Sequence, residues 1–174
     1  MKLAMAQMRM GTSVDENLTQ TLRFMERAGS AGADLIFFPE VQLSPFFPQY
    51  EKADAERWAM SADGPEITAI RDACRKFRIY ASPNVYLKQG EKRYDASLMI
   101  GSGGEILGVS KMVHIAQAKF FYEQDYYTPS DDGFKVYDTP FALQNSGKWG
   151  IIPSVETCEK YPPSILCFRK ERPF

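Results

Sequence analysis

The chain has 174 residues, of which 44% are hydrophobic, 13% aromatic and 25% charged, a composition typical of one globular domain with its own core. Its formal net charge is −1, and lysine and arginine are spread along the sequence, which argues against a nucleic acid or an anionic membrane surface as a partner. No apolar run approaches the roughly 18 residues of a membrane-spanning helix, and the N-terminus lacks the apolar region of a signal peptide.

The cysteines and the histidine restrict the chemistry further. Cys74, Cys158 and Cys167 are an odd number without a CxxC spacing. That pattern indicates a reducing compartment, the cytoplasm, and neither a disulfide framework nor a zinc site. The single histidine, His114, argues against a Ser-His-Asp triad or a histidine-rich metal site.

The first forty residues predict a β-α-β unit. Residues 2–8 have the character of a strand, and Ser13 to Glu16 form a capping box at the start of a helix that ends near residues 29–32. Residues 34–38 are an apolar run bounded by polar and breaker residues, typical of a short strand buried on both faces. The two strands should be parallel and the crossover between them right-handed.

The middle of the chain predicts a second helix and three more strands. After a loop at 41–48 and a polar helical stretch at 49–60, Pro65 begins a helix whose buried stripe includes Cys74 as a small core residue. Residues 79–87 form a strand that bends at Pro83. Residues 93–101 and 105–111 form a β-hairpin through the glycine-rich link 101–104.

The last third of the chain is less regular. Residues 112–133 are aromatic, charged and aperiodic, which is typical of a functional loop. Residues 134–137 and 149–152 are two further strand candidates, and a proline-rich stretch follows them. Because the sequence contains no internal repeat and no clear linker, we expect a single domain over residues 1–174.

Three charged residues stand out by their positions. Glu40 follows the strand at 34–38, where open α/β sheets place their ligands, whereas Lys111 ends the strand at 105–111 and Glu123 lies in the aromatic loop. Each alone fits an ordinary structural role, as a solvated charge or a hydrogen-bond acceptor. A carboxylate–lysine–carboxylate cluster at one end of a sheet would keep the lysine protonated and one carboxylate available as a base.

The ordered motifs around these residues resemble a known family. Phe37-Phe38-Pro39-Glu40 and the stretch 109–115 (Val-Ser-Lys-Met-Val-His-Ile) are similar to the first two signatures of the nitrilase superfamily of carbon–nitrogen hydrolases. Residues 121–123 and 127–134 resemble its N-carbamoylputrescine and carbamoyl-amine amidohydrolase branch. The resemblance covers residues 1 to about 150. It implies an α/β fold, an α–β–β–α sandwich truncated at its C-terminal end, and assembly into a homo-oligomer.

The resemblance also implies a mechanism and a substrate. A cysteine thiolate attacks an amide, carbamoyl or nitrile carbon of a small molecule, and water then hydrolyses the acyl-enzyme. Glu40 matches the general base, Lys111 matches the cation that stabilises the oxyanion, and Glu123 matches the glutamate that positions lysine and substrate. No metal or organic cofactor is implied.

The third signature of the family is not intact. The family pattern places a cysteine after a glycine and three apolar residues, but counting from Gly150 puts Ser154 there, and Cys158 lies four residues beyond it. Cys158 could be the nucleophile through a local rearrangement, or Ser154 could be a substitution at the nucleophile position, poorly activated without a histidine. The third interpretation is a divergent, truncated or frame-altered end after about residue 142. It fits best, because a core strand should not contain Pro153.

Three functions follow from these patterns. The first is hydrolysis of non-peptide carbon–nitrogen bonds through a Glu-Lys-Cys site. The second is a catalytically inactive or truncated homologue with a binding or assembly role. The third, an unrelated flavodoxin-like binding module, is disfavoured because the predicted hairpin interrupts strict alternation of strands and helices.

Overall fold

The computed structural model describes residues 1–133, 135, 137, 139 and 140. The strand candidate at 149–152, Ser154 and Cys158 lie outside the described residues, and the candidate at 134–137 lies partly outside them. The elements in chain order are β1 (Leu3–Met5), α1 (Val14–Ser30), β2 (Leu35–Phe37), η1 (Phe47–Gln49), η2 (Glu56–Trp58), α2 (Pro65–Phe77), β3 (Tyr80–Ser82), β4 (Asn84–Gln89), β5 (Lys92–Ile100), β6 (Ile106–Lys111) and η3 (Glu123–Asp125).

Helix α1 begins and ends where its sequence signals predict. The Ser13 hydroxyl accepts a hydrogen bond from the Glu16 N–H at 3.2 Å and so satisfies one of the free amides of the first turn. The helix also buries two polar side chains, Asn17 and Thr21. Asn17 closes the preceding turn, because its side chain accepts a hydrogen bond from the Gly11 N–H and donates one to the Gly11 carbonyl. The buried face is therefore less apolar than the helical pattern alone indicates.

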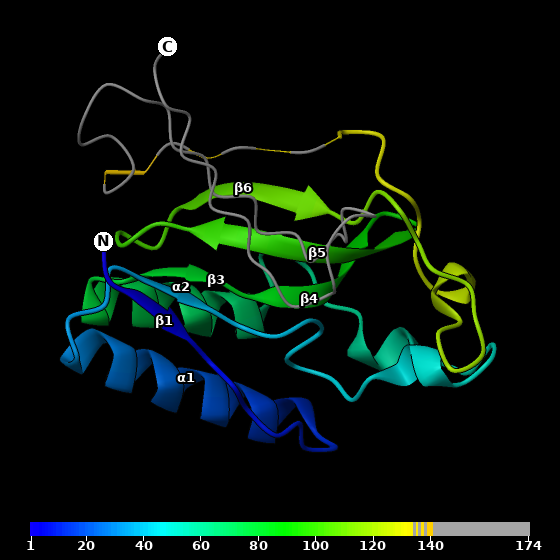
Figure 1. Ribbon diagram of the computed structural model, residues 1–174, viewed down its shortest axis with the longest axis horizontal. Coiled ribbons are helices and arrows are strands. Elements are labelled where there is room, and N and C mark those ends of the chain that lie inside the picture. Colours follow the sequence, from blue (N-terminus) through cyan, green and yellow to red (C-terminus); the bar gives the residue numbers. More distant parts are fainter. Residues whose placement is uncertain (134, 136, 138, 141–174) are drawn as a thin grey trace, which may run out of the picture.

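The strands form one mixed sheet in the described part of the chain. β1, β2 and β3 are parallel neighbours, which confirms the predicted β-α-β unit. β5 is antiparallel to β3, β4 and β6, and the β5–β6 pair is the predicted hairpin. Helices α1 and α2 lie on the same side of this sheet (Figure 1). The main core fills the space between the helices and the sheet, and its fully buried members include Met25, Ile67, Ile70, Ile79 and Leu98.

Pro83 divides the strand predicted at 79–87 into β3 and β4, which confirms the expected bend. A second hairpin joins β4 to β5 at Gly90, whose φ of 60° is left-handed. This hairpin was not predicted, because no apolar alternation marks residues 88–93. Cys74 is fully buried in α2, as predicted.

The prediction of a helical stretch at 49–60 is wrong. The chain there forms only the short helical turns η1 and η2. The physical reason is that backbone amides of this segment find partners elsewhere: the Ala53 N–H donates to the Tyr126 hydroxyl at 2.8 Å, and the Met60 N–H donates to the Tyr86 carbonyl at 2.9 Å. Tertiary hydrogen bonds thus replace those of a helix.

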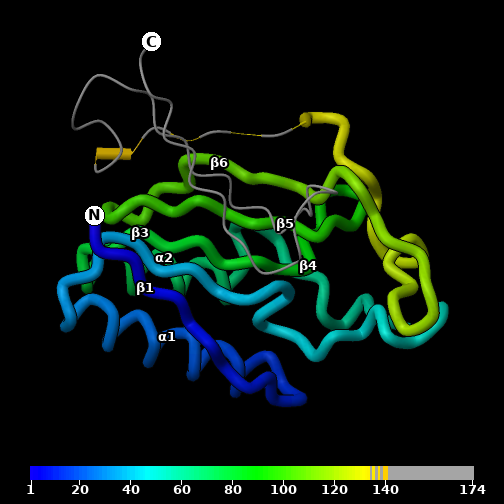
Figure 2. The backbone as a smooth tube through the Cα atoms, viewed as in Figure 1, coloured from blue at the N-terminus to red at the C-terminus, as the bar shows by residue number. Residues whose placement is uncertain are grey.

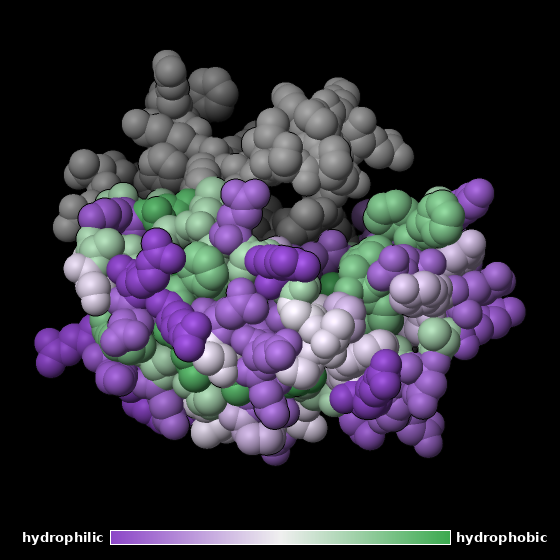
Figure 3. All heavy atoms as spheres, turned by 90° about the horizontal axis from the view of Figure 1, so that it is seen from below, coloured by the Kyte–Doolittle hydropathy of each residue, from purple (hydrophilic) through white to green (hydrophobic). Residues whose placement is uncertain are grey.

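Two loop regions meet at one end of the sheet. Residues 41–60 and 112–133 are drawn in cyan and yellow-green in Figure 2 and lie side by side there. The Tyr122 N–H donates to the Pro48 carbonyl at 2.8 Å, which fixes the contact between them. Seen from the helix side, the surface is largely hydrophilic (Figure 3), as expected for the outer faces of amphipathic helices. No helix of the described residues is long and apolar enough to cross a membrane.

Candidate active site

Glu40 lies in the turn that follows the carboxyl end of β2. The strand residues Leu35, Ile36 and Phe37 are buried, so the turn is carried by a rigid part of the core. Oxygen Oε1 of Glu40 is itself buried, and no described residue donates a hydrogen bond to it. Burial, followed by the charge and the hydrogen bond of Asp95, raises the pKa of Glu40 to about 8.

The residue after Glu40 is held in a conformation that β-branched residues rarely adopt. Val41 has a φ of 41°, in the left-handed region, and its side chain is buried. The Val41 N–H donates to Oδ1 of Asn84 at 2.6 Å, a contact between the turn and the first residue of β4. This hydrogen bond offsets the backbone strain and fixes the direction in which Glu40 leaves the turn.

Asn84 connects this turn to β5. Its Nδ2 donates to Oδ1 of Asp95 at 2.6 Å and to the Ser97 hydroxyl at 3.1 Å. Its backbone N–H donates to Oε1 of Gln42, and the Gln42 side chain donates in turn to the Thr21 hydroxyl of α1 at 3.1 Å. Five buried polar side chains therefore support the Glu40 turn in one continuous network.

Glu123 reaches the same region from the aromatic loop. It begins η3, is buried, and its Oε2 accepts a hydrogen bond from the Ala116 N–H at 3.0 Å. Burial raises the pKa of Glu123, the hydrogen bond from Ala116 opposes that shift, and the nearby charge of Glu40 adds to it. The two glutamates thus lie close enough for their charges to interact.

Tyr127 lies among the same carboxyls. It is buried, and within the described part of the chain its hydroxyl has no hydrogen-bond partner. Burial, followed by the charges of Asp95, Glu40 and Glu123, raises its pKa well above the ordinary value. The hydroxyl therefore stays neutral at physiological pH and is available as a donor to a carboxylate or a ligand.

An aromatic cluster and a polar network hold the loop that carries Glu123. Phe47 packs on Trp58, Tyr86, Tyr126 and Tyr127, with ring centroids 4.8 to 6.0 Å apart. The Tyr126 hydroxyl donates to the Tyr50 carbonyl, and its backbone carbonyl accepts from the Tyr86 hydroxyl at 3.3 Å.

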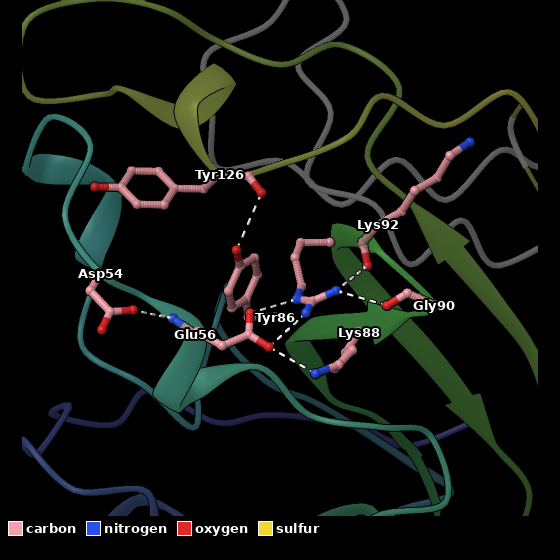
Figure 4. A network of polar contacts seen from close by, with 8 residues as sticks. Asp54, Glu56, Tyr86, Lys88, Gly90, Lys92 and Tyr126 are labelled. Atoms are coloured by element: carbon pink, nitrogen blue, oxygen red, sulfur yellow. Dashed lines mark hydrogen bonds and ion pairs between the residues drawn. The ribbon is translucent and has the colours of Figure 1, made fainter.

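Figure 4 shows this network from close by. The Glu56 carboxylate of η2 forms ion pairs with Lys88 of β4 at 2.8 Å and with Arg93 of β5 at 2.6 Å. The hydrogen bonds from these two cations lower the pKa of Glu56 to about 2. The loop region 41–60, the β4–β5 hairpin and the segment that contains η3 are therefore joined at one end of the sheet. These contacts position Glu123.

Lys111 ends β6 opposite Ala96 of β5. Directly opposite residues of a strand pair point to the same face, so the Lys111 side chain leaves the sheet on the face of Ala96 and not on that of Asp95. Its ammonium lies 4.4 Å from the centre of the Tyr94 ring and 3.4 Å from Oδ2 of Asp132. The cations of Lys135 and Lys111 lower the pKa of Asp132.

The charge of Glu40 thus acts on the buried carboxyl of Glu123, whereas Lys111 forms an ion pair with Asp132. A joint cluster of Glu40, Lys111 and Glu123 stays a prediction, and so do the roles of Cys158 and Ser154, which lie outside the described residues. No group of side chains in the part of the chain that the structure describes is arranged to hold a metal ion. What the arrangement offers is a set of buried carboxyls in which a proton is retained near neutral pH, as acid–base chemistry requires.

A family model for carbon–nitrogen hydrolases matches residues 2–159, most of the chain. The chain belongs to the carbon–nitrogen hydrolase family. It is 27% identical over 147 residues to a citrullinase from Francisella tularensis subsp. tularensis, covering 84% of this chain and 51% of that protein. It is 24% identical over 130 residues to an N-carbamoylputrescine amidase from Arabidopsis thaliana, covering 74% of this chain and 44% of that protein. The chain therefore spans about half the length of these curated relatives.

Solved structures of the family confirm the fold. A carbon–nitrogen hydrolase from Helicobacter pylori G27 superposes with a TM-score of 0.75 at 21% identity, covering 86% of this chain and 50% of that one. An amidase from Nesterenkonia sp. superposes with a TM-score of 0.67 at 20% identity, covering 80% and 51%. The predicted nitrilase-type α/β fold is thus confirmed, and the described residues supply one mixed sheet with helices on one face.

Sequence reasoning missed three residues beside Glu40: Asp95, Asn84 and Tyr127. Asp95 carried a signal, because aspartate is depleted in strands and this one interrupts an apolar run in the middle of β5. Asn84 follows Pro83 at the start of a strand, where a side chain that bonds to a neighbouring backbone is favoured. No local pattern marks Tyr127, since tyrosines are frequent throughout its loop.

Proposed function

We propose that this chain carries the acid–base part of a centre that hydrolyses small amides or N-carbamoyl compounds. The observation that supports it most directly is the state of Glu40: a buried carboxyl at the end of β2, with a raised pKa and with no donor to Oε1 among the described residues. Leaving a buried polar atom without a partner is costly, and such atoms are characteristic of functional sites.

The roles of the residues follow from the family to which the chain belongs. Glu40 removes the proton from the attacking thiol and later from the water that releases the product. Lys111 stabilises the oxyanion of the tetrahedral intermediate, and Glu123 positions the lysine and the substrate. For Lys111 to act in this way, its ammonium must leave Asp132 and turn toward Glu40.

The direct test is the release of ammonia by the purified chain. We expect N-carbamoyl amines and short ω-amides to be hydrolysed, and Glu40→Gln to abolish the release because an amide cannot accept the thiol proton. Glu26→Gln, at an exposed position on α1, is the matched control and should behave as wild type. Equal activity in wild type and Glu40→Gln, or no ammonia from wild type on any of these substrates, would refute the proposal.

The pH dependence has a definite sign. A general base works in its deprotonated form, and the pKa of Glu40 is raised to about 8. The rate of ammonia release should therefore increase from pH 6 to pH 8 as Glu40 ionises. A rate that is constant below pH 7 would contradict Glu40 as the base.

The nucleophile requires its own experiment. If Cys158 is the nucleophile, iodoacetamide should alkylate it faster than Cys167, and Glu40→Gln should slow that alkylation. If Ser154 is the nucleophile, Ser154→Ala should abolish ammonia release while Cys158→Ala leaves it intact. Peptide mass spectrometry after timed alkylation distinguishes the cysteines.

A second candidate function is binding or assembly without turnover. The sequence observation that favours it is the serine at position 154, where the family pattern has its cysteine, followed by a proline-rich segment. This reading predicts that an N-carbamoyl amine binds in calorimetry while no ammonia is released, and that Glu40→Gln changes only the binding.

We also propose a setting for the chain: one domain, acting in the cytoplasm and as a homo-oligomer, on a small-molecule substrate. The odd number of cysteines, without a CxxC spacing, supports the reducing compartment. Sedimentation velocity of the purified chain tests the proposed homo-oligomer. A monomer at micromolar concentration would contradict it.

A further inference from the structure

We propose that Asp95 is the positioning residue of Glu40: the two carboxyls share one proton, and Asn84 holds Asp95 so that the shared proton fixes the Glu40 head beside β5. This inference rests on the proposed function in one respect, that Glu40 is the base whose placement matters. The contact itself does not depend on turnover.

The shared proton follows from the chemistry of the contact. Asn84 links the two residues, because it donates to the Asp95 carboxylate and accepts from the N–H of the residue that follows Glu40. The charge and hydrogen bonding of Asp95 raise the pKa of Glu40, and Oε1 of Glu40 receives no donor from any described residue. Ionised carboxylates only accept hydrogen bonds, so a bond between two of them requires that one be protonated. Two neighbouring buried carboxylates repel each other when both are ionised, which favours a pair with a single proton.

Asn84 links the two partners of the carboxyl pair. Its Nδ2 donates to Asp95 Oδ1 at 2.6 Å, and its Oδ1 accepts from the N–H of Val41, the residue after Glu40, at 2.6 Å. One amide thus touches both partners of the pair, the carboxyl of one and the backbone beside the other. Asp95 is also fixed by its strand, since β5 pairs with both β4 and β6 around it. Because Asp95 is held in a paired strand and Glu40 lies on a turn, we infer that Asp95 holds the Glu40 carboxyl in position.

The other titratable groups near the pair lie in the loop around η3 and at the end of β6. The charge of Glu40 raises the pKa of Glu123 and of Tyr127, and the charge of Asp95 also raises that of Tyr127. Glu123 adds to the repulsion that favours a protonated pair. Lys111 ends β6 one register position from Asp95, but its ammonium is directed to Tyr94 and Asp132.

The test is a carbon-13 titration of the full chain labelled at the glutamate carboxyl carbons. In wild type, the Glu40 resonance should titrate far above the ordinary range of a glutamate, and Glu40→Gln identifies it because this substitution removes that resonance while the Glu123 resonance remains. Asp95→Asn keeps an oxygen acceptor for Asn84 but cannot share the proton in the same way. It should move the Glu40 midpoint down by at least about one pH unit. Ser97→Ala, which removes a neighbouring hydroxyl of the same network, is the matched control and should leave the midpoint in place.

A second measurement needs no substitution of Asp95. In wild type labelled at the aspartate carboxyl carbons, one aspartate resonance should show an inflection at the Glu40 midpoint, because a coupled pair titrates jointly. The inference is overturned if Asp95→Asn leaves the Glu40 midpoint unchanged, if no aspartate shares that midpoint, or if the resonance that Glu40→Gln removes titrates in the ordinary range. An inactive chain with a coupled pair refutes only the proposed function, whereas an active chain with uncoupled carboxyls refutes only this inference.

Discussion

The Glu40 carboxyl lies beside Asp95 and Glu123 at the end of β2, in a region where burial opposes ionisation. The folded state favours the neutral acid of Glu40, whereas the proposed reaction uses its anion. Because the pKa of Glu40 differs between the folded and the unfolded chain, the stability of the protein depends on pH, and this dependence can be measured without a substrate.

The first prediction concerns that dependence. The pKa of Glu40 is about 8 in the folded state, against an ordinary value of 4.5 in the unfolded chain. Between pH 4.5 and 8 the folded state holds a proton that the unfolded state has lost, so the free energy of unfolding falls as pH rises through this window. In Glu40→Gln this contribution is absent. The stability of wild type relative to the variant should fall by a few kcal/mol from pH 5 to pH 8.

Urea unfolding of both proteins at half-unit pH steps measures this difference. Groups with a raised pKa that remain in the variant, such as Glu123, contribute to both curves and largely cancel. Parallel curves for wild type and Glu40→Gln would show that Glu40 ionises normally in the folded state.

Asn84 gives the second prediction. Asn84→Ala removes three side-chain hydrogen bonds, to the Val41 N–H, Asp95 and Ser97, all in a buried region. We expect a loss of about 2–4 kcal/mol of stability, because the partners are left unsatisfied. Ser97→Ala removes only one of these bonds and should cost about 1 kcal/mol. Equal losses for the two variants in urea unfolding would contradict the central place of Asn84.

A local rule, that a residue after a buried strand lies at the sheet's carboxyl end, placed Glu40 in the sequence, but only the resemblance of the surrounding motifs to the family marked it as a base. Its surroundings could not be found in the same way. Asp95 lies 55 positions further along the chain than Glu40, and its side chain meets Glu40 only because β5 crosses the sheet beside β3. Glu123 depends on how an aperiodic loop docks, and that docking is determined by aromatic contacts with no sequence period.

At the scale of elements, the regular signals were reliable. The capping box of α1, Pro65 at the start of α2 and the glycine-rich β5–β6 hairpin all follow from local chemistry. The segment 49–60 was mispredicted as helical because its amides bond to the aromatic loop and to β4, partners that only the folded chain supplies.

The third prediction uses two left-handed glycines at hairpin ends. Gly104 has a φ of 79°, and a Cβ there would lie 2.8 Å from the Arg71 carbonyl of α2; Gly90 has a φ of 60° and open space around it. Gly90→Ala should cost only the left-handed penalty, about 1–2 kcal/mol. Gly104→Ala should cost more, about 2–4 kcal/mol, because it also pushes the β5–β6 hairpin away from α2. Thermal unfolding of the pair compares them directly, and equal costs would show that α2 and the hairpin are not in tight contact.

The fourth prediction concerns the loop that carries Glu123. Tyr126→Phe removes a hydroxyl that accepts from the Ala53 N–H at 2.8 Å and donates to the Tyr50 carbonyl. We expect a loss of about 1–2 kcal/mol and faster proteolysis within residues 50–58. Tyr50→Phe, at an exposed side chain, should change stability by less than about 0.5 kcal/mol. Unchanged proteolysis in Tyr126→Phe would mean that the aromatic packing alone holds the loop.

At the scale of the whole molecule, the two faces of the sheet have different roles. Tyr94, Ala96 and Leu98 of β5 point into the core beneath the helices, whereas Asp95 and Ser97, which alternate with them, point to the opposite face. Asp95 and Ser97 of the polar network around Glu40 thus lie on the face away from the helices, although the network also reaches α1 through Gln42 and Thr21, and the main core lies on the helix side. Substitutions in that core should change stability without changing the titration of Glu40.

Cys74 allows the core to be followed on its own. It is fully buried on α2, and burial raises the pKa of its thiol to about 12. Alkylation requires an exposed thiolate, so iodoacetamide should leave Cys74 unmodified in the native protein at pH 8. In increasing urea its alkylation should coincide with the loss of far-UV circular dichroism, because α2 opens only when the helices leave the sheet. Peptide mass spectrometry follows Cys74 separately from the other two cysteines. Modification of Cys74 at urea concentrations that leave the dichroism intact would show that α2 separates from the sheet before the rest of the core unfolds.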